Sequence, residues 1–134
     1  MRIVLHTNVL VSGVFFSAPP HEILKAWSHG KVQIAMSEEI LEEYRRLGEE
    51  SSKQFLKVDL RPMHELLVTK GEICFPAELP GPVCHDPDDD KFLACAVAEK
   101  VEVIVSGDKH LLMVSGDRGI DVLRPRKFLD QYMS

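Results

Sequence analysis

Residues 85–112, with the sequence HDPDDDKFLACAVAEKVEVIVSGDKHLL, constrain this chain more than any other segment. A cluster of aspartates precedes an amphipathic helix, and Asp108 follows directly after an apolar strand. The helix is long enough to carry the chain back across a sheet, so the two acidic points can meet at one edge. Carboxylates held close together repel one another unless a cation or a helix terminus neutralises them. The segment therefore favours a divalent-metal site and, as a class of protein, a hydrolase.

The composition fits one globular domain, which we expect to span residues 1–134. The three cysteines form no C-x-x-C pair, which argues against a disulfide framework or structural zinc and favours a reducing cytoplasm. No apolar run reaches the length of about 18 residues that spans a membrane. The net charge of −5 argues against binding nucleic acid by bulk electrostatics. It leaves a nuclease open, because metal-binding carboxylates raise the acidic count.

Short apolar runs alternate with amphipathic helices, which is typical of an α/β three-layer sandwich around a mostly parallel sheet. The predicted strands are rich in valine and isoleucine and cover residues 2–5, 32–36, 102–106 and 120–123, with a short edge strand at 72–75. Helices are expected to begin near Pro20, at Ser37, near Asp59, at Asp86 and after Pro125.

The opening residues, MRIVLHTNVLVSGVFF, are predicted to form a first strand and a turn rather than a signal peptide. The polar residues His6, Thr7 and Asn8 interrupt the apolar run there. Gly30 and Gly48 are expected to end helices, and residues 49–57 to form a polar connector.

The acidic start of the helix after residue 85 has a structural explanation beside the functional one. Asp86 suits an N-cap and Asp89 a capping box, with a proline at the first helical position. Asp90 is left without a capping contact and flanks the apolar stripe, so its carboxylate is expected to point into a crevice. An EF-hand loop is excluded, because its sixth and twelfth positions would be Lys91 and Val97.

Asp108 comes after Ser106 and Gly107, at the end of the predicted strand 102–106. Open α/β sheets build their sites at the carboxyl ends of parallel strands, and Ser106 can orient a carboxylate there. The alternative is a loop aspartate that caps a short helix over residues 109–113. The sequence leaves both explanations open.

Glu43 and His6 are the remaining candidates for this edge. Glu43 lies about 90° from the buried stripe of its helix, within reach of an edge site; the alternative is a surface ion pair with Arg46. His6 ends the first strand, level with Asp108, although a lone histidine is more often structural than a ligand. The spacing of the other histidines predicts no site: His21, His29, His64, His85 and His110.

Together these pieces resemble the PIN domain, in particular the short single-domain VapC-like toxins of bacterial and archaeal toxin–antitoxin systems. IVLHTNVLVSG resembles the family's first strand and its D-T-N opening, and SEEILEEYRRL its acidic helix. DPDDDKFLACA resembles the central acidic motif, VSGDKHLL the last acidic strand end, and IDVLRPRKFL the closing strand and helix. The resemblance spans nearly the whole chain and implies a parallel sheet with the first strand central.

The resemblance also implies a metal-dependent endoribonuclease that uses Mg²⁺ or Mn²⁺. Glu43, Asp90 and Asp108 match the second, third and fourth carboxylates of the family's catalytic, metal-binding quartet, and the first falls on His6. The matching supporting residues are Thr7, Asn8 and Ser106. The basic residues expected to contact phosphate are Lys91, Lys109, Arg118, Arg124, Arg126 and Lys127.

His6 is the departure from the family pattern. Imidazole suits Mn²⁺ better than Mg²⁺, and it removes a negative charge from the site. Two hypotheses follow: an active ribonuclease that prefers Mn²⁺, or an inactive PIN-fold module that binds RNA or an antitoxin protein. The resemblance further implies a cognate antitoxin as partner and a homodimer, for which the helix at residues 19–27 is a contact surface.

Overall fold

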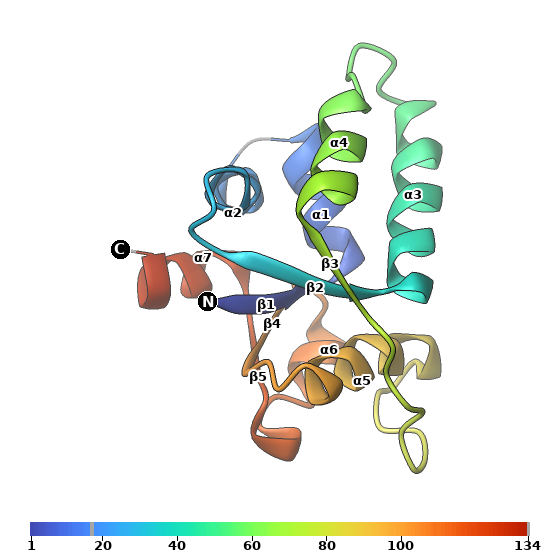
Figure 1. The fold of residues 1–134 in the computed structure, drawn as a ribbon, viewed down its shortest axis with the longest axis vertical. Helices are drawn as coiled ribbons and strands as arrows, with labels where there is room; N and C mark the ends of the chain where they lie inside the picture. The colour runs from blue at the N-terminus through green and yellow to red at the C-terminus, as the bar shows by residue number, and fades with distance from the viewer. Residues whose placement is uncertain (17, 134) are drawn as a thin grey trace.

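The structure, a computed structural model, describes residues 1–16 and 18–133. Its centre is a five-stranded parallel sheet with the order β3-β2-β1-β4-β5 (Figure 1). The strands are β1 (Arg2–Leu5), β2 (Gln33–Ser37), β3 (Gly71–Cys74), β4 (Val103–Val105) and β5 (Asp121–Leu123). The predicted α/β fold, with the first strand central in a parallel sheet, is confirmed. Because all strands run in one direction, their carboxyl ends share one edge.

Helices cover both faces of this sheet. They are α1 (Thr7–Phe15), α2 (Pro19–Ser28), α3 (Glu38–Ser52), α4 (Arg61–Lys70), α5 (Asp90–Ala98), α6 (Lys109–Leu112) and α7 (Pro125–Phe128). Further short helical segments are η1 (Pro87–Asp89), η2 (Asp117–Gly119) and η3 (Leu129–Met133). In Figure 1, α1 to α4 lie above the sheet and α5 and α6 below it. Among the described residues, no helix has the length and apolar character needed to cross a membrane.

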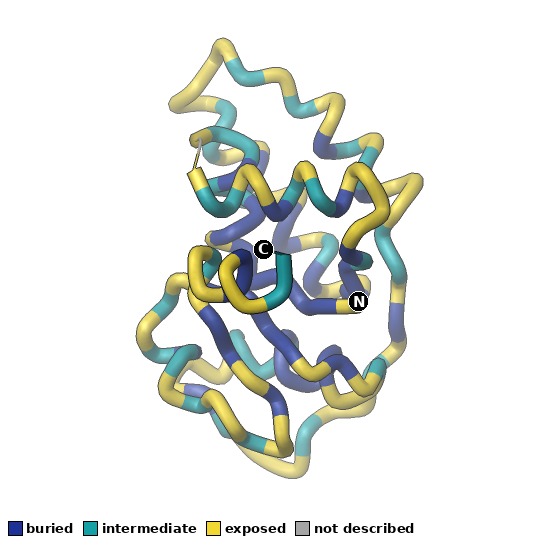
Figure 2. The backbone as a smooth tube through the Cα atoms, turned by 90° about the vertical axis from the view of Figure 1, so that its left-hand side faces the viewer, coloured by how far each residue is buried: buried dark blue, intermediate teal, exposed yellow. Residues whose placement is uncertain are grey.

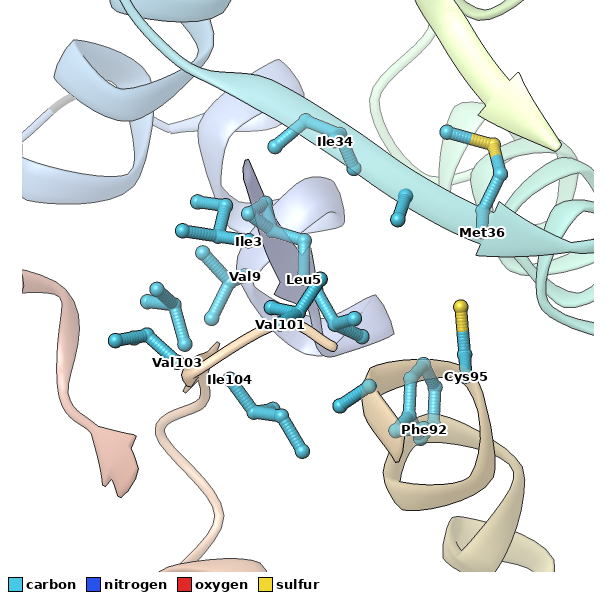
Figure 3. Close-up of a cluster of buried hydrophobic side chains, with 14 of the residues drawn as sticks. Ile3, Leu5, Val9, Ile34, Met36, Phe92, Cys95, Val101, Val103 and Ile104 are labelled. Atoms are coloured by element: carbon cyan, nitrogen blue, oxygen red, sulfur yellow. The ribbon is translucent and has the colours of Figure 1, made fainter. Parts of the chain in front are cut away.

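The inner strands β1, β2 and β4 are buried almost throughout, which explains their continuous apolar runs, whereas the edge strand β3 is half-exposed. Figure 2 shows these buried segments running through the middle of the molecule, with the exposed residues on the outer turns. In Figure 3, side chains of β1, β2 and β4 meet Phe92 and Cys95 of α5 and Val9 of α1. This packing fixes α5 and the start of α1 against the sheet, next to its carboxyl edge.

The register of β1 and β4 brings two polar residues to the same level at that edge. Leu5 pairs with Val105, and the backbone N–H of His6 donates to the Val105 carbonyl at 2.9 Å. Ser106 continues in the same way, because its N–H donates to the carbonyl of Leu123 at 2.9 Å. His6 and Ser106 therefore both leave the sheet at its carboxyl edge.

Two of the sequence predictions on secondary structure are wrong. Residues 7–15 form helix α1 instead of a turn, because burial of Val9 and Leu10 outweighs the modest helix propensity of threonine and valine. Helix α3 continues through Gly48 to Ser52 instead of ending at the glycine. Gly48 serves close packing, since a Cβ there would lie 3.0 Å from the Cε of Met63 on α4. Gly30, in contrast, adopts a φ of 75° just after α2, as expected of a helix-ending glycine.

Substitution by alanine should have a larger effect at Gly13 than at Gly48, although both glycines lie inside helices. A Cβ at Gly13 would lie 2.9 Å from the backbone oxygen of Pro20 and 2.7 Å from the Cδ1 of Leu24. Gly13→Ala should therefore lower the free energy of unfolding by about 1–3 kcal/mol, despite the better helix propensity of alanine. Gly48→Ala meets only the flexible end of Met63 and should stay within about 1 kcal/mol of the wild type. Urea denaturation of both variants measures this; equal losses would contradict the predicted close contact of α1 and α2.

Candidate metal centre

Three side chains of ligand type gather at the carboxyl edge of the sheet: His6, Asp89 and Asp108. Each offers one ligand atom, and these atoms all lie within 4.8 Å of one another. His6 precedes α1, Asp89 ends η1, and Asp108 follows β4. His6 is buried and the two aspartates are half-buried, so the cluster is only partly hydrated.

Contacts on three sides fix the His6 ring. Its edge packs against the ring of Phe92, with centroids 4.8 Å apart and an interplanar angle of 72°. Its Nδ1 lies 2.8 Å from Oδ1 of Asn8, and its Nε2 lies 3.2 Å from Oδ1 of Asp89. An amide oxygen only accepts hydrogen bonds, so Nδ1 is the donor toward Asn8. Nε2 then faces a carboxylate, which is favourable when Nε2 carries a proton or when a cation lies between the two groups.

The Asp89 carboxyl also favours a cation. Its burial raises its pKa above the ordinary value, and the nearby charges of Asp86 and Asp108 act in the same direction, whereas His6 lowers it. A carboxylate in such surroundings is costly to ionise without a positive partner. A divalent ion at this point would compensate Asp89 and Asp108 together.

Asp108 both caps a helix and belongs to the cluster. Its Oδ1 accepts the backbone N–H of His110 at 2.8 Å, which makes Asp108 the N-cap of α6. The Oγ of buried Ser106 accepts the N–H of Asp108 at 3.0 Å, so Ser106 holds the loop rather than the carboxylate itself. A carboxylate has about four lone-pair sites, so capping leaves capacity for an ion.

Glu43 lies at the same edge but is bound by the protein itself. The hydroxyl of Thr7 donates to its Oε2, and the ammonium of Lys91 lies 2.8 Å from its Oε1. Lys91 also pairs with Asp88 at 3.1 Å, and its side chain is only 6% exposed. Burial alone would lower the pKa of Lys91, but the bonds to Glu43 and Asp88 outweigh it and raise that pKa. The predicted surface pair with Arg46 is present at 4.0 Å, and it is the weaker contact.

Asp90 does not join His6, Asp89 and Asp108 in the structure. Its Oδ1 accepts the N–H of Cys84 at 2.7 Å, and its Oδ2 accepts that of Val83 at 3.1 Å. Both donors lie in the loop before η1, so Asp90 closes that loop and, among the described residues, makes no helix-capping contact, as the sequence predicted. Its side chain also lines the groove described below, in agreement with the expected crevice. Burial opposes ionisation of Asp90, yet these hydrogen bonds prevail and lower its pKa. The role of Asp90 and Glu43 as metal ligands stays a prediction.

The donor set of the cluster fits a divalent transition-type ion. One imidazole nitrogen and two carboxylates suit Mn²⁺ and related ions, whereas Mg²⁺ favours oxygen ligands alone. Ligand atoms bonded to one ion at about 2.0–2.2 Å lie about 3–4.4 Å apart. The 3.2 Å between His6 Nε2 and Asp89 Oδ1 falls in that range, and the whole group lies within 4.8 Å. Small side-chain adjustments would thus suffice for His6, Asp89 and Asp108 to bind one ion.

The surroundings of the cluster differ in charge on its two sides. An open groove of about 690 Å³ runs along the loop after β3 and the start of α5. Its lining is acidic and apolar and includes Glu38, Glu39, Phe75, Glu78, Asp88 and Asp90. On the side of β4 and β5, the exposed residues include the basic Lys109, Arg118 and Arg124 and the acidic Asp121. Arg118 is paired with Asp117, and Arg124 donates to the carbonyl of Gly107 at 3.1 Å.

The chain matches the family model of the PIN domain over residues 2–110, which is most of its length, and it belongs to that family. The matched range contains the whole cluster and Glu43. A comparison with curated proteins gives no match. PIN domains are generally metal-dependent nucleases, and in this chain His6, Asp89 and Asp108 form a group that could bind a metal ion.

Sequence reasoning missed two features of this edge. It did not single out Asp89, because spacing alone does not show which of several consecutive aspartates turns toward His6. It also did not foresee that Lys91 neutralises Glu43. The available signal was the position of Lys91, directly after the acidic run, because a buried carboxylate such as that of Glu43 needs a paired cation.

Separate substitutions of Asp89 and Asp90 distinguish the proposed metal ligand, Asp89, from the residue that closes the loop, Asp90. With Mn²⁺ at about 100 times its Kd, binding should add about 2.7 kcal/mol to wild-type stability, and Asp89→Asn should lose this gain. Asp90→Ala should keep the gain but lower metal-free stability by about 1–3 kcal/mol, through its lost hydrogen bonds. Thermal and urea unfolding with and without Mn²⁺ provide the measurement.

The effect of Asp90 also has a predicted pH dependence. Because its folded pKa is lowered, its stabilisation is present above the pKa of a free aspartate and is lost as the pH falls through the folded value. The stability difference between wild type and Asp90→Ala should therefore shrink in acid.

The Mn²⁺ measurement also has an outcome that contradicts the assignment of Asp89 as the metal ligand. If Asp90→Ala loses the stabilisation by Mn²⁺ while Asp89→Asn retains it, Asp90 is the ligand instead.

Lys91 should matter for stability through Glu43. Lys91→Met leaves the Glu43 carboxylate, 10% exposed, with only the distant Arg46 at 4.0 Å among its described cation partners and should cost up to about 3–5 kcal/mol in the free energy of unfolding. Adding Glu43→Gln to that variant should recover part of the loss, since the unpaired charge is gone. Lys57→Met, at an exposed position, is the control and should stay within about 0.5 kcal/mol. Additive losses in the double variant would show that the two side chains are not coupled.

Proposed function

We propose that this protein is a metal-dependent endoribonuclease whose ion, Mg²⁺ or Mn²⁺, is held by His6, Asp89 and Asp108. The observation that supports the proposal is the convergence of these side chains from separate segments, with the Nε2 of His6 directed at Asp89 across 3.2 Å. The family match supports phosphodiester hydrolysis as the reaction of such a cluster. When bound, a divalent ion supplies activation of water and charge stabilisation on the phosphoryl oxygens.

The residues around the cluster have separate tasks in this proposal. Asn8 fixes the ring of His6, and the N–H of His110 fixes the Asp108 carboxylate. Glu43 is neutralised by Lys91 and bonded by Thr7, the neighbour of His6, so it adds no free negative charge to the site. The ligands are thereby held before the ion arrives, which limits the reorganisation needed on binding.

RNA would approach over the side of β4 and β5. Phosphates are repelled by the acidic groove beside α5, whereas Lys109, Arg118 and Arg124 are exposed on the other side. Arg124 is the best placed, because its guanidinium is bonded to the carbonyl of Gly107, next to Asp108. A phosphate contact from Arg124 would position the backbone of the RNA near the cluster.

The proposal includes the role of toxin in a toxin–antitoxin pair, with a homodimer as the assembly. The acidic and apolar groove of about 690 Å³ is complementary to a basic segment with apolar side chains, which is the chemistry we propose for an antitoxin contact. A second candidate is an inactive PIN-fold module that binds RNA or the antitoxin. The observation that favours it is His6, which stands where the family's first aspartate is expected.

Cleavage of a mixed pool of structured RNAs tests the activity. The wild type should cleave better with Mn²⁺ than with Mg²⁺, because an imidazole nitrogen is among the ligands. Asp108→Asn should reduce cleavage by about 100-fold or more, through loss of several kcal/mol of charge stabilisation. His6→Asp should shift the preference toward Mg²⁺.

The pattern across the variants distinguishes the candidates. Cleavage only by His6→Asp would identify the wild type as an inactive binding module. Cleavage by neither protein, in any metal and with both folded, would contradict the proposed reaction. Asp121→Asn, an exposed aspartate on β5, is the control and should cleave like the wild type.

A further inference from the structure

Two histidines whose side chains have no task in the proposed mechanism stack on each other beside the candidate metal centre. The rings of His85 and His110 lie parallel, with centroids 4.3 Å apart and an interplanar angle of 15°. His85 is exposed and directly precedes Asp86, at the start of the acidic segment. His110 is half-buried, and its backbone N–H donates to the Asp108 carboxylate at 2.8 Å. The pair therefore joins the loop before η1 to the first turn of α6, at the rim of the cluster.

The geometry of the pair suits stacking rather than chelation. Nitrogen lone pairs of imidazole lie in the plane of the ring, so two parallel stacked rings direct them side by side and not toward a common ion. The faces of the rings, in contrast, are flat and aromatic. The ring of His110 packs against one face of the His85 ring, and His85 is the exposed residue of the pair.

We propose that His85 and His110 form a stacking platform for an unpaired nucleobase of a single-stranded nucleic acid. The inference rests on the proposed nuclease function and names its substrate as single-stranded at this point. A base stacks on an aromatic ring irrespective of its identity, because every base has a π face. A base on His85 would place its strand beside Asp108, and the guanidinium of Arg124, next to Gly107, would meet a neighbouring phosphate. Duplex nucleic acid would not use the platform, since its bases are already stacked on one another.

Fluorescence anisotropy with short labelled oligonucleotides in EDTA tests the platform without cleavage. His85→Ala should weaken binding of single-stranded RNA by about 5- to 100-fold, the range of one base–aromatic stack. His85→Phe, which keeps a flat aromatic ring, should restore most of the affinity. His29→Ala is the matched control, because His29 is an exposed histidine at the end of α2, before β2 begins.

Two further arms separate stacking from other contacts. The slope of affinity against salt should be unchanged in His85→Ala, since no phosphate contact is lost. Single-stranded DNA of the same sequence should lose affinity in parallel with RNA, because stacking needs no 2′-hydroxyl. An RNA with abasic sugars should bind wild type and His85→Ala equally.

The inference is overturned if His85→Ala binds like the wild type, or if His85→Phe fails to restore binding. It is also overturned if the loss is confined to RNA, if it persists with the abasic strand, or if the wild type binds no oligonucleotide. Cleavage is measured separately with Mg²⁺ and Mn²⁺. Ring-dependent binding without cleavage would leave the platform standing while the nuclease function fails, and cleavage with normal binding by His85→Ala would show the reverse.

Discussion

Carboxylates that a parallel sheet gathers at one edge repel one another, and the cations that compensate them determine how this edge is built. Glu43 receives its compensation from within the chain, through Lys91 at 2.8 Å and the hydroxyl of Thr7. Among the described residues, the group that Asp89 and Asp108 have in common is His6, whose Nε2 lies 3.2 Å from Oδ1 of Asp89. The edge thus has one acid that is neutralised from within the chain and one pair of aspartates without such a lysine partner among the described residues. Under the proposed function, this pair is where an external cation would bind and would stabilise the fold.

The arrangement of the strands could be predicted from the sequence because valine-rich runs separated by amphipathic helices admit few alternatives. The predicted edge strand near Ile73 and the central first strand are both present. Helix α1 was not predictable in the same way, because Thr7, Val9 and Val11 have strand-like propensity and become helical only through tertiary packing. Gly48 was misjudged for a related reason: its role is to admit Met63 of another helix, which local sequence does not reveal.

Part of the candidate site could likewise be predicted from residue spacing, and part depends on packing alone. That His6, Glu43 and Asp108 reach one edge follows from strand ends and helix periodicity. Which aspartate of the acidic segment faces His6 depends on a short η1 turn before α5, which directs Asp89 inward and turns Asp90 back toward Cys84. If one regular helix is assumed to start at Asp86, the side chains of both Asp89 and Asp90 are assigned the wrong direction. The stacking of His85 on His110 could not be predicted from the sequence, because it joins the loop before η1 to the first turn of α6, 25 positions further along (110 − 85).

The central claim is that His6, Asp89 and Asp108 form the metal centre. The most direct test is anomalous diffraction from crystals of the wild-type protein grown with Mn²⁺. The account predicts one peak bonded at about 2.0–2.3 Å to Nε2 of His6 and to carboxylate oxygens of Asp89 and Asp108. A peak bonded instead to Glu43 and Asp90, with Lys91 displaced, would contradict it, as would the absence of any bound Mn²⁺ at this edge.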